Sequence, residues 1–232
     1  MKISLHKPLI IINFKTYLEA TGKKALNLAQ QAEKASEKTG VQIAVSPQFT
    51  DINLISSNID LPVLSQHIDA IKPGSHTGHI LISSVKEAGA VGTLINHSER
   101  QLKLSEIDSI IKISKQNRLL SCVCVNNPAV SGAISTLSPD IISIEPPELI
   151  GTGVAVSKAQ PDIVTNTVNI VKKINPKPMI LCGAGISHPQ DVSVAIKLGT
   201  KGVLVASAIV KAKNPFELLC KFGEAAQNSI QE

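Results

Sequence analysis

Hydrophobic and polar residues follow two alternating patterns along the chain. Short, nearly continuous runs of Ile, Val, Leu and Ala are typical of strands buried on both faces. These runs predict eight strands, at residues 9–12, 41–45, 61–64, 91–95, 119–125, 140–144, 179–182 and 202–205. Between them, apolar residues recur three and four positions apart, as on one face of a helix. These stretches predict helices at residues 23–38, 51–57, 81–88, 105–116, 128–136, 161–174, 189–198 and 215–228.

Residues at the ends of these stretches support the helical boundaries. Ser105 and Asn214 have side chains suited to capping the start of a helix, and Pro161 suits a first helical position. Gly89 and Gly199 stand just after two predicted helices, where a glycine commonly ends the helical conformation.

Strict alternation of strand and helix predicts a parallel sheet with crossover helices. Eight such units in 232 residues favour a closed, single-domain (β/α)8 barrel over an open doubly wound sheet. No linker or low-complexity segment divides the chain, so we expect one α/β domain over residues 1–232. No Gly-x-Gly-x-x-Gly motif follows the first strand, which argues against a dinucleotide-binding fold.

The composition narrows the classes of partner. Aromatic residues make up only 2% of the chain, too few for a platform that stacks single-stranded nucleic acid. The net charge of +5 is spread along many segments, which is typical of solvated helix faces rather than of a nucleic-acid footprint. A weakly positive surface would also help to attract a small anionic substrate.

The cysteines argue against a zinc site, and the apolar runs argue against a membrane-spanning segment. The spacing of the four cysteines, Cys122, Cys124, Cys182 and Cys220, matches no zinc site. Cys122 and Cys124 should share one face of a strand as small buried residues. No apolar run approaches the roughly 20 residues that span a bilayer, and the first twelve residues look like a strand rather than a signal peptide. We therefore expect a cytoplasmic protein.

A barrel places its active site at the carboxyl ends of its strands, so the residues after each apolar run are the candidates. Lys15 follows the first strand as a cation facing the mouth, where it could hold a phosphate or a developing oxyanion; the alternative is a solvated loop lysine. His97 follows the fourth strand and could act as an acid, a base or an electrophile, unless it only caps a helix. Glu99 could pair with Lys15 or simply favour the first turn of the next helix.

The segment after the sixth strand carries the most information. Glu145 ends an apolar strand, and partial desolvation there favours a raised pKa and a capable base. Pro146 and Pro147 stiffen the departure from the strand, whereas Gly151 and Gly153 allow the backbone to flex or approach a ligand. This combination predicts a hinged lid, with an ordinary barrel loop as the alternative.

Small residues follow the last two strands, at 183–185 (Gly-Ala-Gly) and 206–208 (Ala-Ser-Ala). Small side chains leave backbone N–H groups accessible, and phosphate sites in barrels often lie after strands seven and eight. Together the two loops favour a phosphate ligand over tight packing alone.

These segments, taken together, resemble the signature loops of the triosephosphate isomerase family. The matching segments appear in family order and span essentially the whole chain: residues 13–15, 96–100, 145–153, 183–185 and 206–207. Residues 182–187 resemble the short archaeal branch, and residues 146–149 (Pro-Pro-Glu-Leu) stand where the longer branch has Pro-Val-Trp-Ala. The resemblance implies a TIM barrel that interconverts D-glyceraldehyde 3-phosphate and dihydroxyacetone phosphate through an enediol(ate), in glycolysis and gluconeogenesis.

The resemblance also implies a role for each site residue. Glu145 would move the proton between neighbouring carbons, neutral His97 would polarise the carbonyl, and Lys15 would stabilise the enediolate and hold the phosphate. Glu99 would support Lys15. The other implied substrate-binding residues are Asn13, Phe14, Ile150, Gly151, Gly185, Ala206 and Ser207. No metal or organic cofactor is implied, because the enediolate is stabilised electrostatically.

The sequence also gives expectations for the oligomeric state, the partners and the alternative functions. Residues 66–78 resemble the loop that family members use for subunit contact, and a chain this short resembles archaeal tetramers, with a dimer as the alternative. The partners expected are thus a triose phosphate and further copies of the chain, without nucleic acid or membrane. Rival functions are another phosphate-binding barrel enzyme, such as a sugar-phosphate epimerase or a tryptophan-pathway barrel, and a catalytically silent binding barrel.

Overall fold

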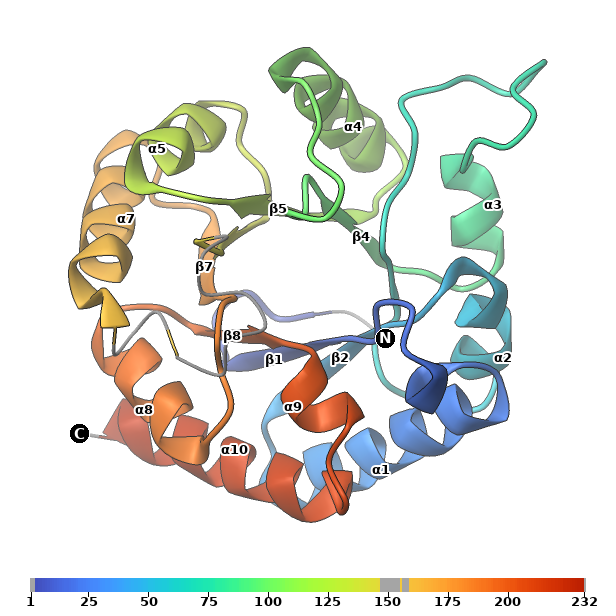
Figure 1. The fold of residues 1–232 in the computed structure, drawn as a ribbon. Coiled ribbons are helices and arrows are strands. Elements are labelled where there is room, and N and C mark those ends of the chain that lie inside the picture. The colour runs from blue at the N-terminus through green and yellow to red at the C-terminus, as the bar shows by residue number, and fades with distance from the viewer. Residues whose placement is uncertain (1–2, 147–154, 156–158, 232) are drawn as a thin grey trace.

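Eight parallel strands form the centre of the structure, a computed structural model that describes residues 3–146, 155 and 159–231 (Figure 1). The strands are β1 (Leu9–Asn13), β2 (Gln42–Ser46), β3 (Leu64–Ser65), β4 (Gly92–Ile95), β5 (Leu120–Val125), β6 (Ile141–Ile144), β7 (Met179–Cys182) and β8 (Gly202–Val205). They are hydrogen-bonded in the order β2-β1-β8-β7-β6-β5-β4-β3. A bridge between Val45 and Val63 then joins the two outer members, so the sheet closes into a barrel.

Helices surround the barrel, and α1 lies beside α10 on its outer side (Figure 1). The longer helices are α1 (Lys23–Thr39), α4 (Leu104–Gln116), α5 (Pro128–Thr136), α7 (Pro161–Ile174), α8 (Pro189–Lys197) and α10 (Pro215–Gln231). Shorter helical turns are η1 (Leu18–Ala20), η2 (Phe49–Asp51), α2 (Ile52–Ser56), α3 (Ile82–Glu87) and α9 (Ser207–Val210). The predicted (β/α)8 barrel is confirmed.

The strands bury both faces, because alternate side chains point to opposite sides of a strand. In β1, Leu9 and Ile11 join the cluster that fills the barrel, whereas Ile10 and Ile12 pack outward against the helices. Cys122 and Cys124 both belong to the inner cluster and are free and buried, as their spacing predicts. This double burial explains why the strands read as continuous apolar runs.

The third strand and the last barrel loop differ from the prediction. The run at 61–64 was expected to form a strand, but β3 contains only Leu64–Ser65. Pro62 has no N–H to donate to a ladder, and it contributes only a carbonyl that accepts from Val45 N at 3.0 Å. The helix α9 was not expected, because its four residues are too few to show a periodic pattern.

The predicted boundary residues have mixed outcomes. Asn214 does cap α10, since its Oδ1 accepts from Glu217 N at 3.2 Å. Ser105 is not a cap: α4 begins at Leu104, which places Ser105 inside the first turn. There the Glu106 carboxylate accepts instead from Lys103 N at 2.9 Å. Among the described residues, no helix is both long and apolar enough to cross a membrane.

Candidate active site

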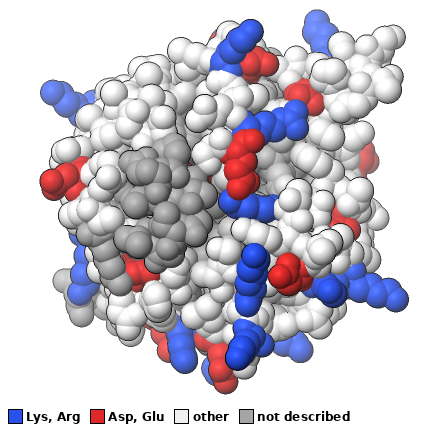
Figure 2. All heavy atoms as spheres, in the orientation of Figure 1, with Lys and Arg blue, Asp and Glu red and all other residues white. Residues whose placement is uncertain are grey.

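The carboxyl ends of the strands bring most of the predicted site residues to one face of the barrel. Lys15 Nζ lies 2.7 Å from Glu99 Oε1, which joins the loop after β1 to the loop after β4. Figure 2 shows basic and acidic side chains side by side near the centre of this face. The Lys15 side chain is largely buried and that of Glu99 is exposed, so the pair lies at the rim of the mouth.

The backbone of Lys15 is held in an unusual conformation. Its φ is +47°, in the left-handed region that non-glycine residues adopt rarely. Asn13 Oδ1 accepts from Lys15 N at 2.9 Å, and Gln66 Nε2 donates to Lys15 O at 2.8 Å. Gln66 also donates to Ser46 O at 3.1 Å. These bonds stabilise the strained conformation and fix the direction in which the ammonium group leaves the backbone.

The two ring nitrogens of His97 face different groups, the backbone of its own loop and the carboxyl group of Glu145. Glu99 N donates to His97 Nδ1 at 3.2 Å, so Nδ1 carries no proton in this arrangement. A neutral ring must then carry its proton on Nε2, which lies 3.4 Å from Glu145 Oε2. The loop therefore selects the tautomer that can donate a proton toward the mouth.

Glu145 is almost completely buried, with 1% of its side chain exposed. Ser143 Oγ donates to Oε1 at 3.1 Å, and Cys124 lines the same cavity as this carboxyl group. Oε2 has no hydrogen bond within the described part of the chain. Burial raises the pKa of Glu145 above its ordinary value, although His97, Cys124, Ser143 and Lys15 act in the opposite direction. The carboxylate is therefore poorly solvated, which suits a base.

Gly183 makes the room that Glu145 needs. A Cβ at this position would overlap Ser143 Oγ and the Glu145 side chain. The glycine is thus required by a close approach between β6 and the loop after β7.

A small hollow of about 50 Å³ lies next to these groups. Its lining includes Lys15, His97, Gly185, Ala206 and Ser207, all of which the sequence predicts for the site. Gly185 has φ +70°, and Ser207 begins α9, whose first N–H groups have no partners within the helix. Backbone donors at the start of this helix, beside Lys15, suit the binding of a phosphate group.

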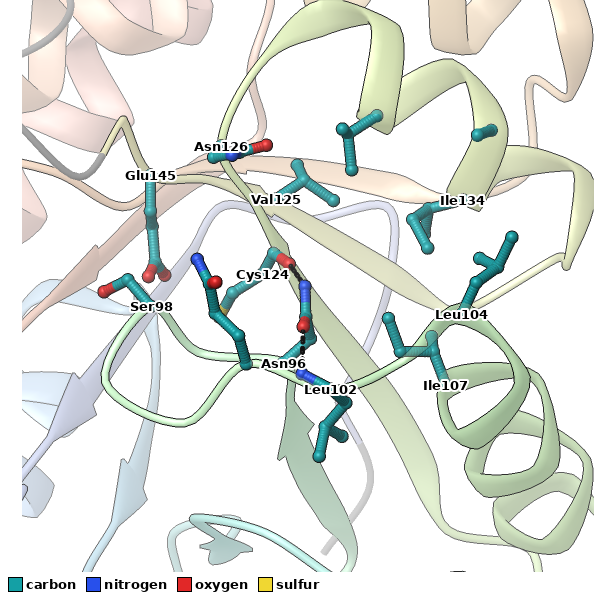
Figure 3. Close-up of a pocket in the computed structure, with 13 residues that line it drawn as sticks. Asn96, Ser98, Leu102, Leu104, Ile107, Cys124, Val125, Asn126, Ile134 and Glu145 are labelled. Carbon is teal, nitrogen blue, oxygen red and sulfur yellow. Dashed lines mark hydrogen bonds between the residues drawn. The ribbon is translucent and has the colours of Figure 1, made fainter.

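A second cavity of about 320 Å³ is lined by Glu145 and extends toward α4 and α5 (Figure 3). Asn96, Ser98 and Asn126 line it near the strands, and apolar side chains such as Leu104 and Ile134 line it between the helices. Glu145 and Cys124 lie at its inner end. Glu145 thus lines the larger, mixed cavity, and His97 and Gly183, which approach its side chain, line the polar hollow.

Comparison with known proteins identifies the family. Residues 8–223 match the family model described as triosephosphate isomerase. The chain belongs to the triosephosphate isomerase family. As a member, it is an isomerase that interconverts glyceraldehyde 3-phosphate and dihydroxyacetone phosphate, a reaction of glycolysis.

Archaeal triosephosphate isomerases are among the most similar relatives. The enzyme of Methanobrevibacter smithii is 54% identical over 215 residues, covering 93% of this chain and 97% of that protein. Those of Methanothermus fervidus and Methanocaldococcus jannaschii are 50% and 53% identical, and each match covers at least 90% of both chains. The predicted resemblance to the archaeal branch is confirmed.

Three of the residues predicted for the site contribute no described side chain to the mouth. Ile150 and Gly151 lie outside the described residues. Phe14 is fully buried among the side chains between strands and helices, so its ring cannot contact a ligand at the mouth. Only the backbone of Phe14 is close to the site, where its N–H donates to Ser46 O at 3.0 Å.

Cys124 and Ser143 also reach the site and were not predicted for it. Three further residues, Gln66, Asn96 and Gly183, lie in segments that the resemblance singles out, but no role was predicted for them. These three directly follow strand ends, whereas Cys124 and Ser143 stand one residue before a strand end, where alternation could have placed them on the inner face of the barrel. What the alternation does not show is which atoms they contact. In the described stretches no three His, Cys, Asp or Glu residues gather into a metal site.

Proposed function

We propose that Glu145, His97 and Lys15 carry out the isomerisation in this chain. Glu145 removes the proton from the carbon beside the carbonyl, forms the enediolate, and returns the proton to the neighbouring carbon. The observation that carries this assignment is the burial of its carboxylate, whose Oε2 has no hydrogen bond among the described residues and lies 3.4 Å from His97 Nε2. It agrees with the roles for which triosephosphate isomerases are known.

His97 acts as the electrophile. Its Nε2–H donates to the carbonyl oxygen, on which negative charge develops as Glu145 takes the carbon-bound proton. When that oxygen takes the Nε2 proton, the ring recovers a proton from the hydroxyl group on the neighbouring carbon. The hydrogen bond from Glu99 N to Nδ1 supports this role, because it leaves the Nε2 proton directed into the site.

Lys15 stabilises the enediolate and holds the phosphate side of the substrate. Asn13 orients Lys15 through the bond to its backbone N–H. Gly185, Ala206 and Ser207 bind the phosphate through backbone or hydroxyl groups around the small hollow. Gly151 and Ile150 complete the site as parts of a lid that excludes water, and the prolines at 146 and 147 set its hinge. No metal or cofactor is required for this electrostatic mechanism.

A coupled assay with glyceraldehyde 3-phosphate tests the assignment of the base. We expect Glu145→Gln to lower kcat by about 10²- to 10⁴-fold, which is the usual contribution of a general base, and still to bind a phosphoglycolate-type inhibitor. Glu87→Gln is the matched control, because Glu87 is exposed at the end of α3. Near-normal turnover of the Glu145 variant would falsify the assignment.

We further propose that residues 1–232 form one domain of a cytoplasmic homo-oligomer, a tetramer by resemblance to the short archaeal branch, with a dimer as the alternative. The proposal is supported by the resemblance of residues 66–78 to the loop that family members use for subunit contact. Light scattering on the purified protein distinguishes monomer, dimer and tetramer, and a single cooperative unfolding transition would support one domain.

A further inference from the structure

Asn96 combines a rare backbone conformation with two side-chain hydrogen bonds. It is the first residue after β4 and has φ +61°. Its Oδ1 accepts from Leu102 N at 2.8 Å, and its Nδ2 donates to Cys124 O at 2.9 Å (Figure 3). One amide therefore ties both ends of a loop to the neighbouring strand.

The loop closed by this amide, residues 97–101, carries the electrophile. Within it, Glu99 N donates to His97 Nδ1, and Arg100 N donates to His97 O at 2.7 Å. The tautomer and the orientation of the ring thus depend on the course of a few backbone groups. Among the described residues, no hydrogen bond joins Asn96 to the ring. Its amide instead fixes the start of the loop at Cys124 O and the end of the loop at Leu102 N.

The second bond connects the loop to the surroundings of the base. The last registered pair of β4 and β5 is Ile95 with Val123, and the Asn96 amide adds one bond beyond it, to the carbonyl of Cys124. The carbonyl of the next residue of β5, Val125, accepts from Glu145 N at 2.7 Å. The chain of contacts from the loop of His97 to Glu145 therefore passes through two consecutive residues of β5.

Asparagine suits both features of position 96, the positive φ and the two side-chain hydrogen bonds. A φ near +60° is open to glycine and, among the other residues, most readily to asparagine. Glycine would supply the conformation without an amide, and most other side chains would supply neither. Asparagine alone provides the turn, a donor and an acceptor at this point.

We propose that Asn96 is a positioning residue for the isomerisation: through its amide it holds the loop of His97 against β5, so that His97 and Glu145 keep their mutual placement. The inference rests on the proposed function of those two residues. Asn96 contacts neither the phosphate hollow nor Lys15 in the interactions described, so its effect belongs to the chemical step rather than to substrate binding.

The variant Asn96→Gly tests the role of the amide, because glycine keeps the backbone conformation. The matched control is Asn175→Gly, at the opposite end of the barrel just before β7. There Asn175 likewise donates to a carbonyl, Ser135 O at 3.2 Å, and accepts from an amide, Lys177 N at 3.1 Å. Both substitutions remove an amide that joins two backbone segments, and only one of these amides lies at the mouth.

We expect Asn96→Gly to lower kcat by up to about 10²-fold, since a displacement of about 1 Å can have that effect, while KM changes little. Asn175→Gly should leave kcat and KM near those of the wild type. Nitrogen NMR of the His97 ring gives a readout that activity does not influence: the wild type should show one neutral tautomer protonated at Nε2, and Asn96→Gly a mixture.

Several outcomes would overturn the proposal. An unchanged kcat in Asn96→Gly, an equal loss of kcat in Asn175→Gly, or an unaltered His97 tautomer would each do so. An inactive wild type would instead contradict the proposed function on which the inference rests. The assay separates the two cases, because the wild type is measured before any variant.

Discussion

The carboxyl group of Glu145 shows how a single residue can serve chemistry at the expense of stability. It is buried, its Oε1 accepts a hydrogen bond from Ser143, and its Oε2 has no hydrogen bond within the described residues. Burying an ionised group with an unpaired oxygen is unfavourable. A solvent-exposed carboxylate would be more stable and a weaker base.

This arrangement makes the stability of the protein depend on pH through Glu145. Burial raises the pKa of Glu145 in the folded state, so the folded protein binds a proton that the unfolded chain has already released. Stability is therefore lost as pH rises from the ordinary carboxyl pKa through the raised value. We expect Glu145→Gln to be more stable than the wild type by about 1–3 kcal/mol near pH 8, and by less near pH 5.

Urea unfolding at the two pH values measures this difference. Glu87→Gln serves again as the control and should follow the wild type at both. A Glu145→Gln variant that is less stable than the wild type near pH 8 would contradict the argument, because it would mean that the ionised carboxylate is well compensated in its pocket.

Gly183 leads to a second prediction at this scale. In Gly183→Ala the added Cβ overlaps Ser143 Oγ and Glu145, so we expect the base to be displaced and kcat to fall by about 10²-fold. Gly132→Ala is the control, since its Cβ overlaps Ile170 at the contact of α5 with α7, away from the mouth. The control should lose stability and keep its kcat; equal losses of kcat in both variants would point to a general packing effect.

At the scale of elements, the loop that follows β3 is held by one carboxylate. Asp69 lies 3.0 Å from His67 Nε2, accepts from Ile80 N at 2.6 Å, and lies 3.5 Å from a guanidinium nitrogen of Arg100. Burial acts to raise the pKa of Asp69, but the bonds from Ile80 and His67 lower it on balance. These contacts join both ends of the loop to the loop that carries His97.

The contacts of His67 and Asp69 predict that the folded protein loses stability in acid. Burial, reinforced by the charge of Arg100, lowers the pKa of His67 despite the opposing effect of Asp69. The unfolded chain therefore binds a proton first as pH falls, and stability is lost below the ordinary histidine pKa of about 6.5. We expect His67→Asn to flatten the decline in unfolding free energy between about pH 7 and pH 5, measured by urea unfolding.

The control for this prediction lies in the same loop. His79 is exposed, so His79→Asn should leave the slope unchanged. If both variants showed the wild-type slope, the acid sensitivity would have to come from groups outside this loop.

The elements also show which parts of the fold a sequence can predict. Seven of the strands follow from continuous apolar runs, because burial on both faces leaves no other pattern. The misplaced β3 and the unexpected α9 depend instead on a missing N–H at Pro62 and on a single helical turn. Neither feature changes the hydrophobic pattern, so periodicity could not find it.

The same limit applies to the site. Lys15, His97 and Glu145 could be predicted because a barrel fixes which strand ends face the mouth. Gln66 and Asn96 also follow strands, but a polar side chain at a strand end looks the same whether it meets water or a carbonyl. Their hydrogen bonds to Lys15 O and Cys124 O join segments far apart in sequence, and only the folded chain brings these together.

At the scale of the whole molecule, the barrel is a sheet of eight strands whose outer members meet through little more than the bridge of Val45 with Val63. The strands β7 and β8 likewise share only one registered pair, whereas β1 and β2 are in register over five. A barrel with such thin joints does not resist local opening equally around its circumference.

The consequence concerns motion rather than chemistry. Val45 N, which donates to the carbonyl of Pro62 across the joint of Val45 with Val63, should exchange its amide hydrogen with solvent sooner than the amides of β1. Hydrogen exchange followed by NMR would show it as lower protection at the joint, whereas uniform protection around the ring would contradict it. Gln66 lies just beyond that joint and donates to the backbone carbonyl of Lys15. Local opening of the barrel there would therefore disturb Lys15, the residue proposed to bind the phosphate, before the other site residues.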